Sequence, residues 1–180
     1  VPELVLDVPF ATTLSTGQAR LFEVHVPQDR TLRVQLTSSS KEASNEVFIR
    51  YRTAPTLASY DAAYEGGLAS DVQAVIPTTE PGDYYVLVRG FAEPAANTPV
   101  QLLAELVPLA ITSVDSDVGG DAKYVTTTIR GARFHASAIV KLVRPGIAEY
   151  EPVNYRVIDA TTIVATFDFT DAPHGLYDLK

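Results

Sequence analysis

Residues 80–90, with the sequence EPGDYYVLVRG, hold a turn and a strand pattern that together indicate the fold class. Pro81 fixes its φ angle at about −65° and Gly82 accepts a positive φ angle, so the pair predicts a tight turn. From Tyr84 onward the side chains alternate, and both alternating sets are largely apolar. We therefore expect an interior strand of a β-sandwich, with Tyr84 forming a tyrosine corner in which its hydroxyl group bonds to nearby backbone.

Short alternating stretches of the same kind recur along the chain, separated by turns, and very little of the sequence favours helix. In residues 31–37 the alternation is clearest, with Leu32, Val34 and Leu36 predicted to face a core. The predicted strands are residues 19–26, 31–37, 46–52, 72–76, 84–90, 100–107, 111–114, 124–130, 139–143, 153–158 and 162–169, after a lead-in or edge segment at residues 1–10. The sequence thus predicts an all-β protein.

The chain is long enough for one large domain or two small ones. Residues 107–110, VPLA, have the character of a linker, so we expect domains at residues 1–107 and 108–180. A turn glycine followed two residues later by a tyrosine occurs in both parts, at Gly82 and at Gly175, which favours one closing hairpin in each domain. The prediction is two antiparallel β-sandwiches in tandem, with the second truncated at its C-terminal strand.

Composition excludes several classes of function. The net charge is −8 and no basic stripe is present, so neither nucleic acid nor an anionic membrane surface is an expected partner. No apolar run approaches the roughly 20 residues that cross a bilayer, so membrane insertion is not expected either. The absence of cysteine removes disulfides, thiolate metal sites and cysteine nucleophiles. An acidic, cysteine-free, threonine-rich β protein is typical of bacterial exported proteins.

No pattern of catalytic residues is present, and we predict that the chain is not an enzyme. The sequence lacks the G-x-S-x-G motif that places a nucleophilic serine on a strained turn. The three histidines, His25, His135 and His174, are too far apart in sequence for a zinc motif and are interpreted as surface or partly buried single residues.

Aromatic residues around the long irregular stretch at residues 53–70 form the first candidate site. Tyrosine and arginine are the residues most enriched in binding hot spots. The candidate patch comprises Phe48, Arg50, Tyr60, Tyr64 and Tyr85. Such a patch would suit extended protein or polysaccharide, whereas packing in a core explains most of the same residues equally well.

Three aspartates form the second candidate site, a metal site. Asp115, Asp117 and Asp121 are spaced D-x-D-x-x-x-D around a glycine pair. Their carboxylates could converge on calcium, which takes about six to eight oxygen ligands. The alternative is a solvated acidic loop between two strands, which involves no cofactor.

Three stretches of the first part of the chain carry a resemblance to a known family: LSTGQARLFEVHVPQDRTLRVQL (residues 14–36), VFIRYRTAPTLASYDA (residues 47–62) and EPGDYYVLVRG (residues 80–90). With these elements in this order, residues 14–106 resemble the bacterial pre-peptidase C-terminal domain. The resemblance implies a small jelly-roll-like sandwich attached to secreted peptidases and other exoproteins. In the collagen-binding relatives calcium is held partly by acidic residues of an N-terminal linker, where this chain has only Glu3 and Asp7.

Four motifs of the second part carry a second resemblance: ITSV (residues 111–114), TTTIRGARF (residues 126–134), VKLVRPG (residues 140–146) and APHGLYDL (residues 172–179). Through them, residues 109–180 resemble the IPT/TIG immunoglobulin-like domain. The family usually has proline and glycine after its first strand, where this chain has DSD at residues 115–117. The resemblance implies an immunoglobulin-like spacer of a surface protein or exoprotein.

Together these observations predict a non-catalytic accessory module of a secreted or surface bacterial multidomain protein. The module would target or position the other domains of the same polypeptide on a macromolecular substrate, outside the cell or at its surface. Two alternatives remain open from the sequence. One is a purely structural spacer, and the other is a calcium-stabilised module that binds collagen-like protein or polysaccharide.

Overall fold

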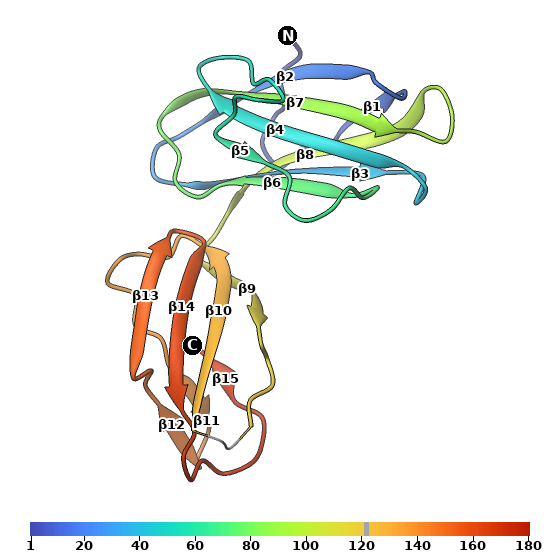
Figure 1. Cartoon of the computed structure of the whole chain (residues 1–180). Helices are drawn as coiled ribbons and strands as arrows, with labels where there is room; N and C mark the ends of the chain where they lie inside the picture. The colour runs from blue at the N-terminus through green and yellow to red at the C-terminus, as the bar shows by residue number, and fades with distance from the viewer. Residues whose placement is uncertain (121–122) are drawn as a thin grey trace. The chain divides into compact units, whose positions relative to one another are not determined.

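The structure is a computed structural model of the chain and describes residues 1–120 and 123–180. All regular secondary structure in these residues is β-strand, which confirms the predicted all-β fold class. The chain divides into two compact units, Val1–Val107 and Pro108–Lys180, and each is a sandwich-like body (Figure 1). No helix in the described ranges is long and apolar enough to cross a membrane.

The first unit contains two four-stranded antiparallel sheets. Their strand orders are β1-β8-β3-β6 and β2-β7-β4-β5. The strands are β1 (Phe10–Leu14), β2 (Ala19–Val26), β3 (Thr31–Ser38), β4 (Ser44–Tyr51), β5 (Ala62–Ala63), β6 (Val72–Ile76), β7 (Gly82–Ala92) and β8 (Thr98–Val107). Strand β7, which contains residues 82–90 of the EPGDYYVLVRG stretch, pairs with β2 on one side and β4 on the other, as expected for an interior strand.

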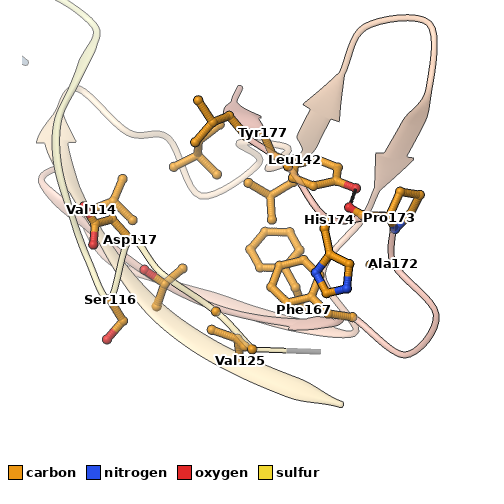
Figure 2. Close-up of a pocket in the computed structure, with 17 residues that line it drawn as sticks. Val114, Ser116, Asp117, Val125, Leu142, Phe167, Ala172, Pro173, His174 and Tyr177 are labelled. Carbon is orange, nitrogen blue, oxygen red and sulfur yellow. Dashed lines mark hydrogen bonds between the residues drawn. The ribbon is translucent and has the colours of Figure 1, made fainter. Parts of the chain in front are cut away.

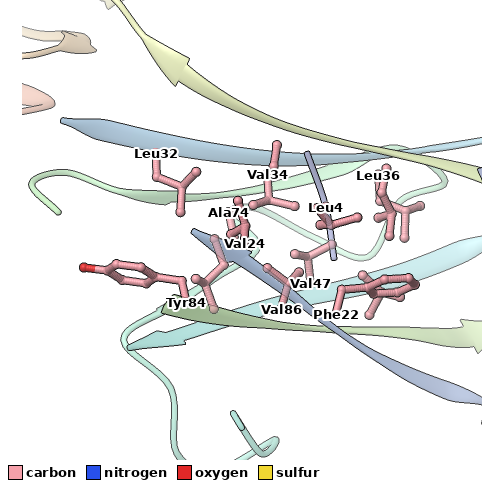
Figure 3. Close-up of a cluster of buried hydrophobic side chains, with 14 of the residues drawn as sticks. Leu4, Phe22, Val24, Leu32, Val34, Leu36, Val47, Ala74, Tyr84 and Val86 are labelled. Carbon is pink, nitrogen blue, oxygen red and sulfur yellow. The ribbon is translucent and has the colours of Figure 1, made fainter. Parts of the chain in front are cut away.

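The core of the first unit lies between the two sheets (Figure 3). Alternate side chains of each strand point inward, as with Val24 on β2, Val34 on β3 and Val86 on β7, all of which are fully buried. Leu4 also reaches the core, because its backbone N–H bonds to the Glu23 carbonyl oxygen at 2.7 Å and holds the lead-in segment against β2. The sequence pattern of residues 1–10 did not mark Leu4 as a core residue.

The second unit contains a four-stranded sheet, β13-β14-β10-β9, and a three-stranded sheet, β12-β11-β15. Its strands are β9 (Ala110–Asp115), β10 (Tyr124–Ala132), β11 (Leu142–Arg144), β12 (Ala148–Tyr150), β13 (Asn154–Asp159), β14 (Thr162–Asp168) and β15 (Asp178–Leu179). Its buried hydrophobic cluster consists of Ile129, Val140, Ile163, Ala165 and Phe167. This core is much smaller than that of the first unit.

Some strand boundaries differ from those predicted. The strand predicted at residues 139–143 begins only at Leu142, and Ile139 is 73% exposed. Four strands were not predicted: β1, β5, β12 and β15. The last three are only two or three residues long, too short to show a period-two pattern.

Candidate functional site

The outer face of the β2-β7-β4-β5 sheet carries an apolar row that runs across the strands. The register pairs Leu21 on β2 with Leu87 on β7, and Leu87 in turn with Phe48 on β4. These directly opposed residues share one face of the sheet. Because neighbouring strands lie about 4.8 Å apart, the row spans roughly 10 Å.

Charged residues and a tyrosine lie on both sides of this row. On one side, Tyr85 stands between Glu23 on β2 and Arg50 on β4. On the other side, the Arg89 guanidinium donates to the Glu46 carboxylate at 2.9 Å, with side-chain exposures of 28% and 11%. A partly buried ion pair of this kind fixes both side chains in place, so the face has a defined pattern of charge around an apolar centre.

An aromatic cluster covers the β4 end of the row. The rings of Tyr60 and Tyr64 lie against Phe48, with centroid distances of 5.2 and 5.9 Å. The Tyr64 hydroxyl group donates to Glu46 Oε1 at 3.4 Å. Burial, with Glu46 as a further cause, raises the pKa of Tyr64 above its ordinary value.

The five residues predicted as a patch lie close together on this face. Phe48 is only 5% exposed, because Tyr60 and Tyr64 cover it, while Tyr60 itself is 45% exposed. Arg50, Tyr64 and Tyr85 are half-buried. Sequence reasoning missed Leu21, Leu87 and Phe91, although the alternation along β2 and β7 places all three on the outer face. They complete the surface as a candidate binding face, which we call the outer face of the first unit.

The residues predicted as a metal site are Asp115, Asp117 and Asp121. Asp121 lies outside the described residues, so the structure does not describe the full set. The Asp115 carboxylate lies 3.6 Å from Arg130 Nε, and Asp117 is exposed on the loop that follows β9. Within the described part of the chain, no three histidine, aspartate or glutamate residues gather as a metal cluster.

A cleft of about 260 Å³ lies in the second unit, near Asp117 (Figure 2). Phe167 and Phe169 form part of its wall, and Asp117 and His174 also line it. Leu176 borders the cleft and is 94% exposed. All three histidines are exposed, and His25 Nδ1 is hydrogen-bonded to Asp83 Oδ1 while His135 Nδ1 is hydrogen-bonded to Ser137 Oγ, each at 2.8 Å.

The fold and the face described above define the first unit as a β-sandwich module. Residues 18–90 match the family described as the bacterial pre-peptidase C-terminal domain, so this part of the chain is a domain of that family. The match lies inside the range for which the sequence predicts it. Domains of this family are non-catalytic accessory domains of secreted bacterial proteins. No curated protein sequence matches the chain.

The solved structures similar to the chain include a collagenase domain and a copper-binding protein. One is the pre-peptidase C-terminal domain of a collagenase from Bacillus anthracis, with 12% identity and a TM-score of 0.46, covering 57% of this chain and 92% of that one. The other is CorA, a surface-associated copper-binding protein of Methylomicrobium album BG8, with 9% identity and a TM-score of 0.43, covering 59% of this chain and 98% of that one.

Proposed function

We propose that the chain is a non-catalytic targeting module of a secreted or cell-surface bacterial protein, and that the outer face of the first unit binds an extended macromolecule. The observation that carries this proposal is the apolar row of Leu21, Leu87 and Phe48. It lies between the row of Glu23, Tyr85 and Arg50 and the Arg89–Glu46 ion pair. An apolar centre with a polar rim is the usual anatomy of a protein-binding surface.

The chemistry of the face favours a protein ligand over a polysaccharide. Polysaccharide is recognised by stacking on exposed aromatic rings, and in the predicted patch only Tyr60 is largely exposed while Phe48 is buried. Glu23 and Arg50 flank Tyr85 with opposite charges. Opposite charges on either side of a tyrosine complement a polypeptide that carries both signs of charge. A collagen-like protein fits this description, since it is extended and bears both acidic and basic side chains.

For the second unit we propose an IPT/TIG-like immunoglobulin spacer over residues 108–180. Its two short sheets enclose a small core, and in the described residues its histidines and acids do not gather as a metal cluster. In this proposal the second unit separates the binding module from the other domains of the parent polypeptide, which are its expected partners.

Retention of the chain by insoluble collagen, with cellulose and chitin in parallel, tests the binding proposal. Tyr60→Ala and Tyr85→Ala are each expected to weaken collagen binding by about tenfold, because both remove hot-spot side chains from the outer face. Tyr155→Ala is the matched control, since Tyr155 is an exposed tyrosine on β13 of the second unit. Thermal melting of each variant shows whether the fold is intact.

Three results would contradict the proposal in different ways. Retention by none of the polymers would favour a purely structural spacer. Retention by cellulose or chitin alone would favour a polysaccharide ligand. Equal retention of Tyr155→Ala and of both outer-face variants would place binding somewhere other than the outer face.

A further inference from the structure

Three buried side-chain oxygens in the described residues have no hydrogen-bond partner, and all three belong to the first unit. They are Oδ1 of Asn45 and both carboxylate oxygens of Glu93. Asn45 is fully buried at the start of β4, and Glu93 follows the end of β7. A buried carboxylate without a partner is costly, so a group that completes this arrangement is expected.

Gly90 connects the two residues. In the β4–β7 ladder Asn45 pairs directly with Gly90. A Cβ atom at position 90 would stand 3.0 Å from Glu93 Cγ and 3.1 Å from Glu93 Oε1. Directly opposed residues project from the same face of a sheet, so the Glu93 atoms occupy the space that a larger residue 90 would fill, opposite Asn45. Glycine at this position therefore leaves room for the Glu93 side chain on the face to which Asn45 belongs.

Among the described residues, no group donates a hydrogen bond to these three oxygens. The Asn45 Nδ2 group donates to the Ser70 carbonyl oxygen at 2.9 Å, which fixes Oδ1 as the free end of the amide. The Ser15 carbonyl oxygen stands 2.7 Å from the Cβ position of residue 90 and adds another acceptor nearby. Among the described residues, Glu93 is in no ion pair with lysine, arginine or histidine within 4.0 Å.

The backbone around these oxygens is held in place by hydrogen bonds between loops. The Glu93 backbone N–H donates to Thr16 Oγ1 at 2.8 Å, and the Asn97 backbone N–H donates to Ser15 Oγ at 2.9 Å. The turn before β2 and the loop after β7 are therefore tied together. The backbone that carries the Glu93 carboxylate is therefore fixed by hydrogen bonds to another loop. This distinguishes it from the backbone of an acidic surface loop without such bonds.

From these observations we infer a site for a hard cation at Asn45 and Glu93. A water molecule donates at most two hydrogen bonds, whereas three oxygens need a partner and one group carries negative charge. A hard cation ligated by carboxylate, amide and backbone oxygens meets both requirements. This site shares no residue with the aspartates of the second unit or with Glu3 and Asp7. Glu3 forms an isolated β-bridge with Glu23.

The test is the thermal stability of the first unit after treatment with chelator and transfer into choline chloride, sodium chloride or calcium chloride. A cation that binds only the folded state is expected to raise the Tm of the wild type by about 5 °C or more at saturation. The calcium and sodium arms show whether the cation is divalent or monovalent. Calorimetric titration of the wild type with calcium chloride measures binding without relying on a variant.

Glu93→Gln provides the decisive comparison, because the variant and the wild type are expected to exchange their order of thermal stability between chelator and cation. With chelator the variant is expected to be at least as stable as the wild type, since its neutral amide can donate to Asn45 Oδ1. With the bound cation the wild type becomes the more stable of the two. Glu42→Gln is the matched control, since Glu42 is exposed in the same unit, and it should respond to cations as the wild type does.

Equal Tm values of the wild type in all three salts, with no heat of calcium binding, would overturn the inference and indicate a protonated or hydrated Glu93. A cation response that Glu93→Gln retains in full would overturn it as well, because the cation would then bind elsewhere. Loss of collagen retention would affect only the proposal for the outer face, so failure of either proposal is recognised separately.

Discussion

The Tyr84 hydroxyl oxygen accepts a hydrogen bond from the backbone N–H of Glu80, four residues earlier, at 3.0 Å. The Tyr84 ring is 3% exposed and packs against Tyr51 with a centroid distance of 4.9 Å. Burial raises the pKa of Tyr84 above its ordinary value. The predicted tyrosine corner is thus confirmed. A similar contact occurs in the second unit, where the Tyr177 hydroxyl group donates to the Pro173 carbonyl oxygen at 2.7 Å.

Replacing Tyr84 by phenylalanine is expected to lower the free energy of unfolding of the first unit by about 1 kcal/mol, because the ring remains but the Glu80 N–H loses its partner. Urea denaturation measures the change. Tyr85→Phe is the matched control, since Tyr85 lies on the opposite face of the same strand and is half-buried. Equal stability of the two variants would show that the corner adds nothing to stability.

Substitutions of Phe48 and Tyr60 are expected to distinguish a residue that stabilises the fold from one that is available for binding on the outer face. Phe48→Ala should lower the free energy of unfolding by about 3 kcal/mol, because it leaves a cavity beneath the two tyrosine rings. Tyr60→Ala should cost less than about 1 kcal/mol, since nearly half of that side chain already faces solvent. Denaturation of both variants checks the difference, and a large loss in Tyr60→Ala would mean that the tyrosine supports the fold more than it serves a ligand.

The sequence was sufficient for the fold class and for most strands, because the sandwich core depends on a local period-two pattern. Residues 19–26 and 72–76 coincide with β2 and β6 residue for residue. Elements without that pattern were not predicted. Strand β5 has two residues, and it pairs with β4 only because the loop after Tyr51 returns beside that strand. Leu4 is buried by a backbone contact with Glu23 that no local pattern encodes.

The candidate sites were harder to predict than the strands, because they depend on contacts between residues far apart in sequence. The outer-face residues could be predicted in part, because Phe48 and Arg50 alternate on one strand and tyrosines are conspicuous. Their row with Leu21 and Leu87 depends on the register between strands far apart in sequence. The pairing of Asn45 with Gly90, against which the Glu93 side chain packs, arises from the same long-range register. Sequence spacing alone gives no signal for it.

The pH dependence of stability should include a contribution from Asp71. The Lys41 ammonium group donates to this carboxylate, and the Ser38 backbone N–H donates to its other oxygen at 3.0 Å. The bond from Lys41, followed by that from Ser38, holds the pKa of Asp71 below its ordinary value. A depressed folded-state pKa gives stability that is present above the unfolded-state pKa of about 4 and is lost as the pH falls through the folded-state value.

Asp71→Asn is therefore expected to be less stable than the wild type by about 0.5 kcal/mol at pH 7, a small value because the pair is solvent-exposed. The difference should shrink as the pH falls below the unfolded-state pKa of about 4 and through the lower folded-state pKa of Asp71, because the wild-type carboxyl group then becomes protonated too. Urea denaturation of both proteins across this pH range measures it. A difference that stays constant with pH would mean that packing or the neutral hydrogen bond, and not the charge of Asp71, is responsible.

Gly131 is the position at which the second unit should tolerate substitution least. A Cβ atom there would stand 2.1 Å from the Ala110 carbonyl oxygen and 2.4 Å from Phe134 Cζ, at the register shift between β9 and β10. The carbonyl belongs to the paired strand and cannot move without breaking the ladder. Gly131→Ala is expected to lower the free energy of unfolding of this unit by about 2 kcal/mol or more.

Hydrogen exchange of the Ile129 and Ile163 amides reports the stability of β10 and β14 within the intact chain, and both amides should exchange faster in Gly131→Ala. Gly67→Ala is the control, because a Cβ atom there meets nothing within 4 Å. It should leave both rates unchanged. Unchanged exchange in Gly131→Ala would mean that β9 separates from β10 at little cost, so that the close approach of the Ala110 carbonyl contributes little to holding the sheet together.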